Sequence, residues 1–233
     1  MRRILITGAS SGIGKATARA LLDAGHEVIG FCRSVEKLPD GVQGIYCDLS
    51  EEASVRAAFE TVRDQVGEVD VLINNAGIAY LSRISDGDIA DWDRMWNVNV
   101  RGLALCCQLG ISVLNQTSGQ IINISSMSGH RVPPTGGFYA PTKFAVRAIT
   151  ESLRAEFRMD GVKIRVASVS PGFVDTPLLD DYFKGREDTL RSTKEQLKML
   201  TAEDISESIL HVLDMPLHVE VGDIQLRSVD QKA

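Results

Sequence analysis

The sequence predicts an α/β protein in which helices cover both faces of a parallel sheet. Short apolar runs, the expected strands, alternate with longer segments of helical periodicity along the chain. Continuous apolar strands that alternate with helices are typical of parallel sheets buried on both faces. The chain has 233 residues, of which 44% are hydrophobic and 24% charged. These values are typical of a soluble globular protein, and we expect residues 1–233 to form a single domain.

Charge and composition argue against several classes of protein. The net charge of -6 is opposite to the basic excess of most nucleic-acid binders. No apolar run approaches the ~20 residues of a membrane span, and the run after Met1 is too short for a signal peptide. The cysteines show no Cys-x-x-Cys spacing and lie in apolar segments, so we expect reduced core thiols and a cytoplasmic protein. They are Cys32, Cys47, Cys106 and Cys107.

The first expected strand, residues 3–7, leads into a glycine-rich turn with the spacing Gly8-x-x-x-Gly12-x-Gly14. A helical pattern follows, with Ile13 on its apolar face. Glycines let a backbone approach a pyrophosphate, and the helix N-terminus offers free N–H groups and a positive dipole end. An ordinary glycine turn is the alternative, but the position at the first strand–helix junction favours a dinucleotide phosphate site.

The second expected strand, residues 27–31, ends in Cys32-Arg33-Ser34. A dinucleotide-binding unit specific for NAD places an acid here to hold the ribose 2′-hydroxyl. This sequence has no acid at that point, and Arg33 and Ser34 instead suit a 2′-phosphate. The pattern therefore favours NADP(H) over NAD(H), with a solvated surface arginine as the alternative.

The middle of the chain supplies two more strands and a long helical region. We expect strands at 44–47 and 69–73, and a helix after the first of them that is capped by Ser50. The region 88–115 has a helical pattern but contains Asn99, a poor helix former. This predicts either a local kink or a polar role for Asn99.

A fifth strand at 120–124 leads to a stretch containing Tyr139 and Lys143, at the start of a helix expected over 144–157. Spacing of i, i+4 places both side chains on one helix face. A lysine ammonium ~4 Å from the phenol, at an effective dielectric of ~20, favours the phenolate by roughly 4 kcal/mol. This would lower the pKa of the tyrosine by up to about three units and make it a general acid/base. Such a pair taken alone is a weak signal, because surface Tyr/Lys pairs are common.

The last third of the sequence predicts strands at 163–170 and 222–227 and a helix that opens with a capping box from Thr201 to Asp204. Between them, residues 178–200 are charged and lack a firm period. We expect this segment to be a mobile lid over the substrate.

Six motifs in this order resemble the short-chain dehydrogenase/reductase family, and the resemblance covers the whole chain. It implies a Rossmann-type, doubly wound sheet of seven strands that binds one NAD(P)(H). The motifs are Thr7-Gly8-x-x-x-Gly12-x-Gly14, Asn74-Asn75-Ala76-Gly77, Asn99, Ser126, Tyr139-x-x-x-Lys143 and Pro171-Gly172.

The resemblance implies four catalytic residues. Tyr139 would be the general acid/base, and Lys143 would lower its pKa and hold the nicotinamide ribose. Ser126 would hydrogen-bond the substrate oxygen, and Asn99 would position a water that links Lys143 to solvent. Ser125 is a rival for Ser126, but the family places its serine thirteen residues before the tyrosine, which selects Ser126.

The resemblance also implies the binding residues. Tyr139 and Lys143 are expected to bind the cofactor as well as to act in catalysis. The residues expected at the adenosine and phosphate half of the cofactor are Gly8, Ser11, Gly12, Ile13, Arg33, Ser34, Asp48, Leu49, Asn75, Ala76 and Gly77. At the nicotinamide end it places Pro171, Gly172, Val174 and Thr176. Substrate contacts are expected from Ser126, Met127, Tyr139, Phe173 and Leu178. No metal site is expected, because the four histidines lack ligand-like spacing.

We therefore expect an NADP(H)-dependent oxidoreductase that interconverts a secondary alcohol and a ketone or aldehyde, acting as a homodimer or homotetramer. Two segments resemble a branch that includes bacterial 3-hydroxy acid (serine-type) dehydrogenases and a vertebrate keto-reductase: Met127-Ser-Gly-His-Arg131 and Leu217-His-Val-Glu-Val-Gly-Asp-Ile-Gln-Leu-Arg227. A dehydrogenase of small 3-hydroxy acids is thus the alternative, and a non-catalytic NADP-sensing protein is a more distant one. The hydroxy acid would need a cation, for which Arg131, Lys184 and Arg186 are candidates. The expected apolar wall is Met127, Val132, Phe138, Phe173, Leu178, Leu179, Tyr182 and Phe183.

Overall fold

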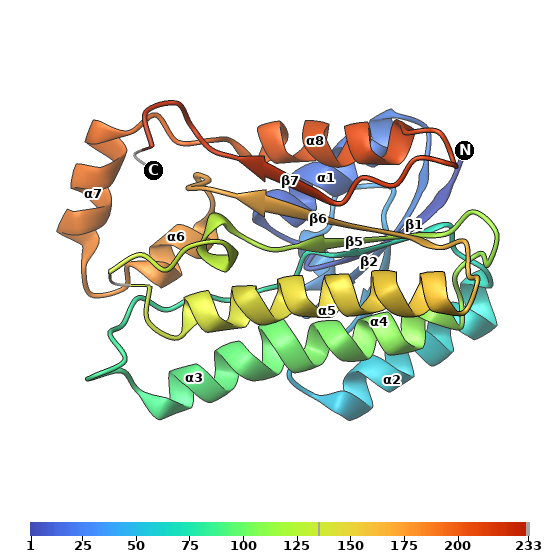
Figure 1. Ribbon diagram of the computed structural model, residues 1–233, viewed down its shortest axis with the longest axis horizontal. Helices are drawn as coiled ribbons and strands as arrows, with labels where there is room; N and C mark the ends of the chain where they lie inside the picture. Colours follow the sequence, from blue (N-terminus) through green and yellow to red (C-terminus); the bar gives the residue numbers. More distant parts are fainter. Residues whose placement is uncertain (135, 232–233) are drawn as a thin grey trace.

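The computed structural model describes residues 1–134 and 136–231, and within them the chain forms one all-parallel sheet of seven strands. The order is β3-β2-β1-β4-β5-β6-β7, with every neighbouring pair parallel. This confirms the predicted Rossmann-type α/β fold (Figure 1). The strands are β1 (Arg3–Thr7), β2 (Glu27–Cys32), β3 (Gln43–Tyr46), β4 (Val71–Asn74), β5 (Gln120–Ile124), β6 (Arg165–Pro171) and β7 (Asp223–Leu226).

Helices cover both faces of this sheet, because its strands carry apolar side chains on both sides. On one face, α1 (Gly12–Asp23) and α8 (Ala202–Asp214) pack through residues such as Leu21 and Ile209. On the other, α2 (Glu52–Thr61), α4 (Leu103–Ile111) and α5 (Tyr139–Met159) pack through Phe59, Leu103 and Val146. Figure 1 shows the two layers above and below the sheet.

Three further helices lie toward the carboxyl ends of the strands. They are α3 (Ile89–Trp96), α6 (Pro177–Tyr182) and α7 (Glu187–Gln196), and Figure 1 shows α6 and α7 beyond the sheet edge at which the strands end. In the sheet, β1 lies between β2 and β4, so the strand order changes direction at β1. Ligands of doubly wound sheets bind at the carboxyl ends beside such a switch point.

The long helical region is interrupted where the sequence contains its poor helix former. A π-helical segment, η3 (Asn97–Gly102), joins α3 to α4 and contains the buried Asn99. Single π turns inside α-helices commonly mark functional positions. The kink expected at Asn99 is therefore present, with a polar role described below.

One local prediction was wrong. Ser50 does not cap the next helix, because its N–H and hydroxyl both donate to Asp48 Oδ1, at 2.9 and 2.7 Å, and Glu51 occupies the N-cap position. Residues 178–200, in which the sequence shows no firm period, form most of α6 and all of α7, and α7 buries none of its side chains. Their role as a lid stays a prediction. The predicted capping box at Thr201 and Asp204 is present, and all four cysteines are free and buried, as expected.

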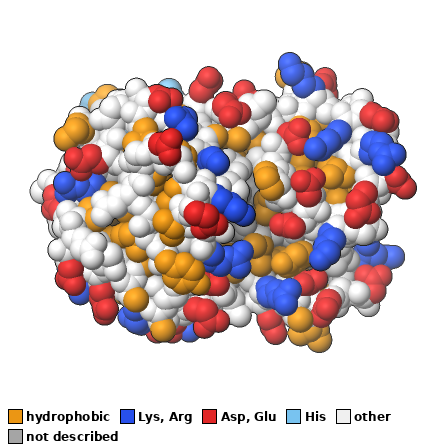
Figure 2. Space-filling model, turned by 180° about the vertical axis from the view of Figure 1, so that it is seen from behind, with side chains coloured by type: hydrophobic (Ala, Val, Ile, Leu, Met, Phe, Trp, Pro, Cys, Tyr) orange, Lys and Arg blue, Asp and Glu red, His pale blue; other side chains and the backbone are white. Residues whose placement is uncertain are grey.

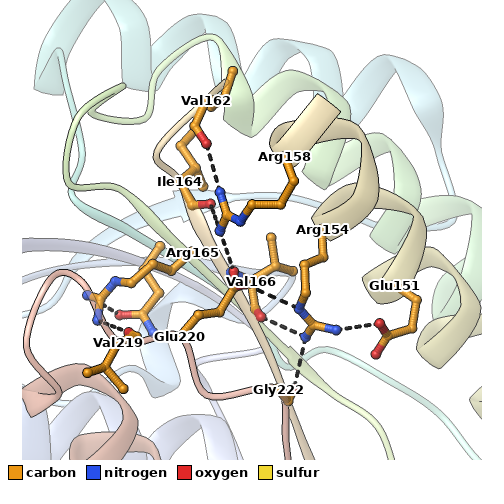
Figure 3. A network of polar contacts seen from close by, with 11 residues as sticks. Glu151, Arg154, Arg158, Val162, Ile164, Arg165, Val166, Val219, Glu220 and Gly222 are labelled. Carbon is orange, nitrogen blue, oxygen red and sulfur yellow. Dashed lines mark hydrogen bonds and ion pairs between the residues drawn. The ribbon is translucent and has the colours of Figure 1, made fainter. Parts of the chain in front are cut away.

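An arginine network fixes the amino end of β6 (Figure 3). Arg154 donates to the carbonyls of Val166 and Gly222 at 2.8 and 3.0 Å. Arg158 pairs with Glu220 at 2.7 Å, and Glu220 in turn accepts the Val166 N–H at 2.8 Å. These bonds tie the segment before β7 to β6 and so fix the register of the edge strand.

The face seen in Figure 2 carries acidic and basic side chains interspersed with separate hydrophobic groups. In the described part of the chain, no helix is both long enough and apolar enough to span a bilayer.

Candidate active site

A cavity of about 1360 Å³ opens at the carboxyl ends of the strands, beside the switch point between β1 and β4. The structure brings to its lining every predicted cofactor residue and every predicted substrate residue. Of the four predicted catalytic residues, Ser126, Tyr139 and Lys143 line the cavity, whereas Asn99 lies just behind the lining.

The glycine turn forms a narrow cradle at the N-terminus of α1. Gly8 and Gly12 have φ values of +71° and +52°, which favour glycine. A Cβ on Gly14 would come within 2.2 Å of the Gly8 carbonyl oxygen and 2.4 Å of Asn75 Nδ2. The turn therefore packs against itself and against the end of β4, and it leaves the first N–H groups of α1 directed at the cavity, where an anion would bind.

Thr7 joins the ends of β1 and β4 beneath this cradle. Its hydroxyl accepts the N–H groups of Asn75 and Ala76, both at 3.0 Å. The Asn75 amide donates to the Thr7 carbonyl at 2.9 Å. Asn75 thus joins the ends of β1 and β4 by hydrogen bonds, which explains why a polar side chain follows the buried strand β4.

Two cations stand where β2 ends. Arg33 and Ser34 line the cavity as predicted, and Lys37, in the short 3-10 helix η1 (Val35–Lys37), lines it as well. Sequence reasoning missed Lys37, although a second cation four residues after Arg33 in the sequence is a signal that could have been used. Both side chains belong to exposed residues, so they are free to fold onto a dianion.

Asn99 holds a loop rather than facing the cavity. Its Oδ1 accepts the Ile78 N–H and its Nδ2 donates to the Ile78 carbonyl, both at 2.8 Å. Nδ2 also lies 3.2 Å from the Thr142 hydroxyl on α5. The π turn thus clamps the loop after β4 against the helix that carries Tyr139 and Lys143. The role of Asn99 in positioning a water stays a prediction.

The two serines after β5 have different environments. Ser125 donates its hydroxyl to the Lys143 carbonyl at 3.2 Å and is buried. Ser126 contacts Tyr139, and its hydroxyl accepts the Ser128 N–H at 3.1 Å. The geometry therefore favours Ser126 as the serine that would face a substrate oxygen.

Tyr139 and Lys143 share one face of α5, but the predicted coupling between them differs from what the structure shows. Lys143 Nζ lies 5.8 Å from the centre of the Tyr139 ring and donates to the Ile124 carbonyl at 2.9 Å. Burial raises the pKa of Tyr139, and the hydrogen bond to Ser126 only partly opposes this rise. Burial also lowers the pKa of Lys143 to about 8. We expected Lys143 to lower the pKa of Tyr139 toward neutral pH, and in the protein without bound ligands this does not occur.

Aromatic and aliphatic groups form the other end of the cavity. Tyr182 lies edge-on to Tyr139, with ring centres 5.9 Å apart, and Phe183 packs against Tyr182 at 5.0 Å. Burial raises the pKa of Tyr182 to about 12. Phe138 was predicted for this wall, but it stacks on Trp92 at 5.1 Å instead and is absent from the described lining.

The charged residues at this end differ from those predicted. Of the three candidate cations, Arg131 lines the cavity, whereas Lys184 and Arg186 are not among the described lining residues. Two acidic residues, Asp181 and Asp230, line it as well. Sequence reasoning missed Asp181, which lies in α6. It also missed Asp230 and Gln231, because no local pattern indicates that residues after β7 return to the site.

Comparisons with known proteins agree with this geometry. A family model described as short chain dehydrogenase matches residues 2–187. The human protein named dehydrogenase/reductase SDR family member 11 is 40% identical over 247 residues, covering 99% of this chain and 95% of the relative. A closed serine dehydrogenase complexed with NADP+ has a TM-score of 0.92 at 28% identity, covering 99% of this chain and 96% of that one. An alcohol dehydrogenase from Thermococcus sibiricus, complexed with 5-hydroxy-NADP, has a TM-score of 0.86 at 30% identity, covering 100% and 99%.

Proposed function

Because the chain belongs to the short-chain dehydrogenase family, we propose that it is an NADP(H)-dependent oxidoreductase that interconverts a ketone or aldehyde and an alcohol, with Tyr139 as general acid/base. The observation that carries this proposal is one continuous cavity with a phosphate cradle at one end. The Ser126–Tyr139 pair and an apolar wall line the rest of it.

NADP(H) is the cofactor that fits the residues present. The cradle of Gly8, Gly12 and Gly14 would hold the pyrophosphate, and Arg33, with Lys37 beside it, would pair with the 2′-phosphate. When bound, the nicotinamide supplies or accepts the hydride. The residues that line the opposite end of the cavity, from the 171–176 loop, would hold its ring. The serine and alcohol dehydrogenases compared above were solved with NADP+ and an NADP derivative.

The proton chemistry follows from the protonation states at neutral pH. Burial raises the pKa of Tyr139, so its phenol keeps the proton that a reduced carbonyl oxygen must receive. Ser126 lies beside that hydroxyl and would hydrogen-bond the same oxygen. Lys143, with a pKa of about 8, is mostly protonated at neutral pH and places positive charge behind the phenol. These states favour reduction near neutrality, and alcohol oxidation should become faster as the pH rises.

The lining favours a modest apolar ketone as the substrate. Tyr182 and Phe183 present apolar surface, while Asp181 and Asp230 would repel a carboxylate. The alternative, a small 3-hydroxy acid, has two observations in its favour: Arg131 lines the cavity, and the chain is similar to a serine dehydrogenase. Comparing kcat/KM for a neutral ketone with that for serine or 3-hydroxybutyrate separates the two. A hydroxy acid preferred by more than about tenfold, or ~1.4 kcal/mol of transition-state stabilisation, would reject the apolar ketone.

The catalytic assignment is tested by replacing Tyr139 with Phe. This removes the proton donor and little else, so turnover should fall by about a hundredfold or more, the scale of general acid catalysis, while NADPH affinity stays nearly unchanged. The control is Tyr46→Phe, because Tyr46 is 59% exposed and outside the described cavity lining. More than a few per cent of wild-type turnover in the Tyr139 variant would contradict the assignment.

We also propose a cytoplasmic homodimer or homotetramer. The apolar residues that we expected on the pairing helices are Leu103, Leu105, Val146, Ile149 and Leu153. Leu103, Val146 and Leu153 are buried on their own sheet, whereas Leu105 and Ile149 are partly buried. The same layer exposes Trp96 by 43% and Phe144 by 39%, which are better candidates for a contact between copies. Light scattering that gives the 25.4 kDa monomer mass at micromolar concentration would reject the oligomer. Four buried free thiols suit a reducing compartment.

A further inference from the structure

We propose that residues 228–231 are part of the active site and that Gln231 is a positioning residue, which holds the loop at the nicotinamide end of the cavity. This inference rests on the proposed function for the identity of that end. Nothing in the sequence motifs involves this segment, yet Asp230 and Gln231 both line the cavity.

The first observation is that three distant segments hold the backbone of the 172–175 loop. Gln231 Oε1 accepts the Phe173 N–H at 3.0 Å. The Phe173 carbonyl accepts the Leu200 N–H at 3.0 Å, and the Gly172 N–H donates to the Leu226 carbonyl at 2.7 Å. Of these contacts, only the one from Gln231 comes from a side chain, so it is the contact that a substitution can remove without altering the backbone.

The second observation explains the glycine of the Pro171-Gly172 motif. A Cβ on Gly172 would come within 2.2 Å of Gln231 Oε1 and within 3.1 Å of Arg227 Cβ. The amide of Gln231 therefore occupies the space that a side chain at position 172 would need. A side chain at position 172 would have to displace this amide, so the glycine leaves room for the Gln231 contact.

The third observation links this segment to the expected lid. Asp230 Oδ2 accepts the Lys198 N–H at 3.4 Å, a long hydrogen bond beside the end of the 178–200 segment. Leu200 also bonds the Asp175 N–H at 2.9 Å. The loop, the lid and residues 228–231 thus meet at Phe173, whose ring lies 6.4 Å from that of Phe183. Displacing Gln231 should therefore disturb the cofactor loop and the apolar wall together.

The chemistry of the contact predicts which replacements succeed. Leu at position 231 keeps the bulk but offers no acceptor, which leaves the Phe173 N–H without its partner. Glu keeps the acceptor and so should keep the loop in place, although it adds charge near Asp181 and Asp230. Val229, fully exposed in the same segment, provides a matched control as Val229→Ala.

The experiment measures hydrogen exchange at the Phe173 amide and NADPH affinity by fluorescence titration in the full chain. Gln231→Leu should speed exchange at Phe173 and weaken NADPH binding by about three- to tenfold, the scale of one lost hydrogen bond. Gln231→Glu and Val229→Ala should keep slow exchange, and α8 amides should be unchanged in all three variants. Exchange at Phe173 as slow in Gln231→Leu as in the wild type, or NADPH affinity within twofold of it, would overturn the inference.

These readouts need no substrate, so they separate the inference from the proposed function. If the wild-type protein binds NADPH but reduces no ketone and oxidises no hydroxy acid, the proposed function fails and the exchange result still stands. If turnover is found, Gln231→Leu should lower kcat/KM with Gln231→Glu partly restoring it. A Leu variant with unaltered kcat/KM would count against a positioning role.

Discussion

The two halves of the cavity are built in opposite ways. The cofactor half is made of turns that follow β1, β2 and β4 directly, and close backbone contacts hold it, such as the approach of Gly14 to the Gly8 carbonyl. The substrate half is made of α6, α7 and the segment after β7, which meet through single hydrogen bonds and an exposed ion pair between Lys194 and Asp175 at 2.7 Å. Both halves carry charges of both signs: Arg33, Lys37, Asp48 and Glu51 line the first, and Arg131, Asp181 and Asp230 line the second.

This difference indicates that the fold fixes the cofactor half of the cavity, whereas the substrate half can vary in sequence and length. The carboxyl ends of parallel strands lie at the same edge of the sheet. A cofactor that serves many reactions can therefore be held by residues whose positions the sheet fixes. The substrate differs between reactions, and its wall is made of connections whose length and composition can change without altering the sheet. Substitutions in the first half should therefore affect folding and cofactor binding together. Those in the second half should affect the substrate and the lid, except at Gln231, which also holds the cofactor loop.

The largest effect is expected for Gly14→Ala. In a helix this change normally stabilises by about 1 kcal/mol, but here the added Cβ would lie 2.2 Å from a backbone oxygen. We expect the free energy of unfolding to fall by about 1–3 kcal/mol, the cost of overpacking, and NADPH binding to be lost. Urea unfolding and fluorescence titration measure both quantities.

The control for that change is Gly222→Ala at the other end of the sheet, where a Cβ comes no closer than 3.9 Å to another group. Equal stability of the two variants would show that the cradle is not the tightly packed half of the cavity.

An intermediate effect is expected for the two cations. Arg33→Ala should weaken NADPH binding by about tenfold or more, since a charge-assisted hydrogen bond contributes about 1.5–3 kcal/mol, and should change NADH binding by less than twofold. Lys37→Ala should have a smaller effect of the same kind. Arg19→Ala, an exposed site outside the described lining, removes the same charge as a control. An unchanged ratio of the two affinities in both variants would contradict a 2′-phosphate site.

The smallest effect is expected for Lys194→Ala. The side chains of Lys194 and Asp175 are 40% and 58% exposed, and such pairs contribute about 0–1 kcal/mol. We expect KM for the substrate to rise by less than about threefold, with faster proteolysis within residues 183–200 and no change in NADPH affinity. The difference from wild type should vanish at high salt. A change in NADPH affinity as large as that of Arg33→Ala would show that the two halves are not separable.

Sequence patterns predicted the fold because they report local properties. Apolar runs located the seven strands, and glycine and asparagine motifs located the strand ends that line the cavity. Boundaries were less accurate: Ser50 was predicted to be a cap, but Asp48 accepts its hydrogen bonds instead. Helical spacing placed Tyr139 and Lys143 on one face, yet it could not show that Lys143 Nζ bonds the Ile124 carbonyl. The pKa argument failed mainly because burial raises the pKa of Tyr139, which helical spacing does not report.

The missing parts of the site depend on contacts between residues far apart in the sequence. Phe138 stacks on Trp92, and Gln231 reaches Phe173, and neither pairing has a periodic or spacing signal. Lys37 is different, because its spacing from Arg33 was available and was not used. The residues at the strand ends and most of the apolar wall were therefore predictable, whereas the placement of Phe138 and the return of residues 230–231 to the site were not.

The support of the Phe173 loop by distant segments has a consequence for synthesis of the chain. A domain generally folds as a unit, and here both ends of the cavity depend on residues that are made late. The helix that begins at the cradle, α1, packs against α8, and the Phe173 loop lacks two of its partners until Leu226 and Gln231 arrive. The site of each molecule would therefore be complete only after residue 231 has been made.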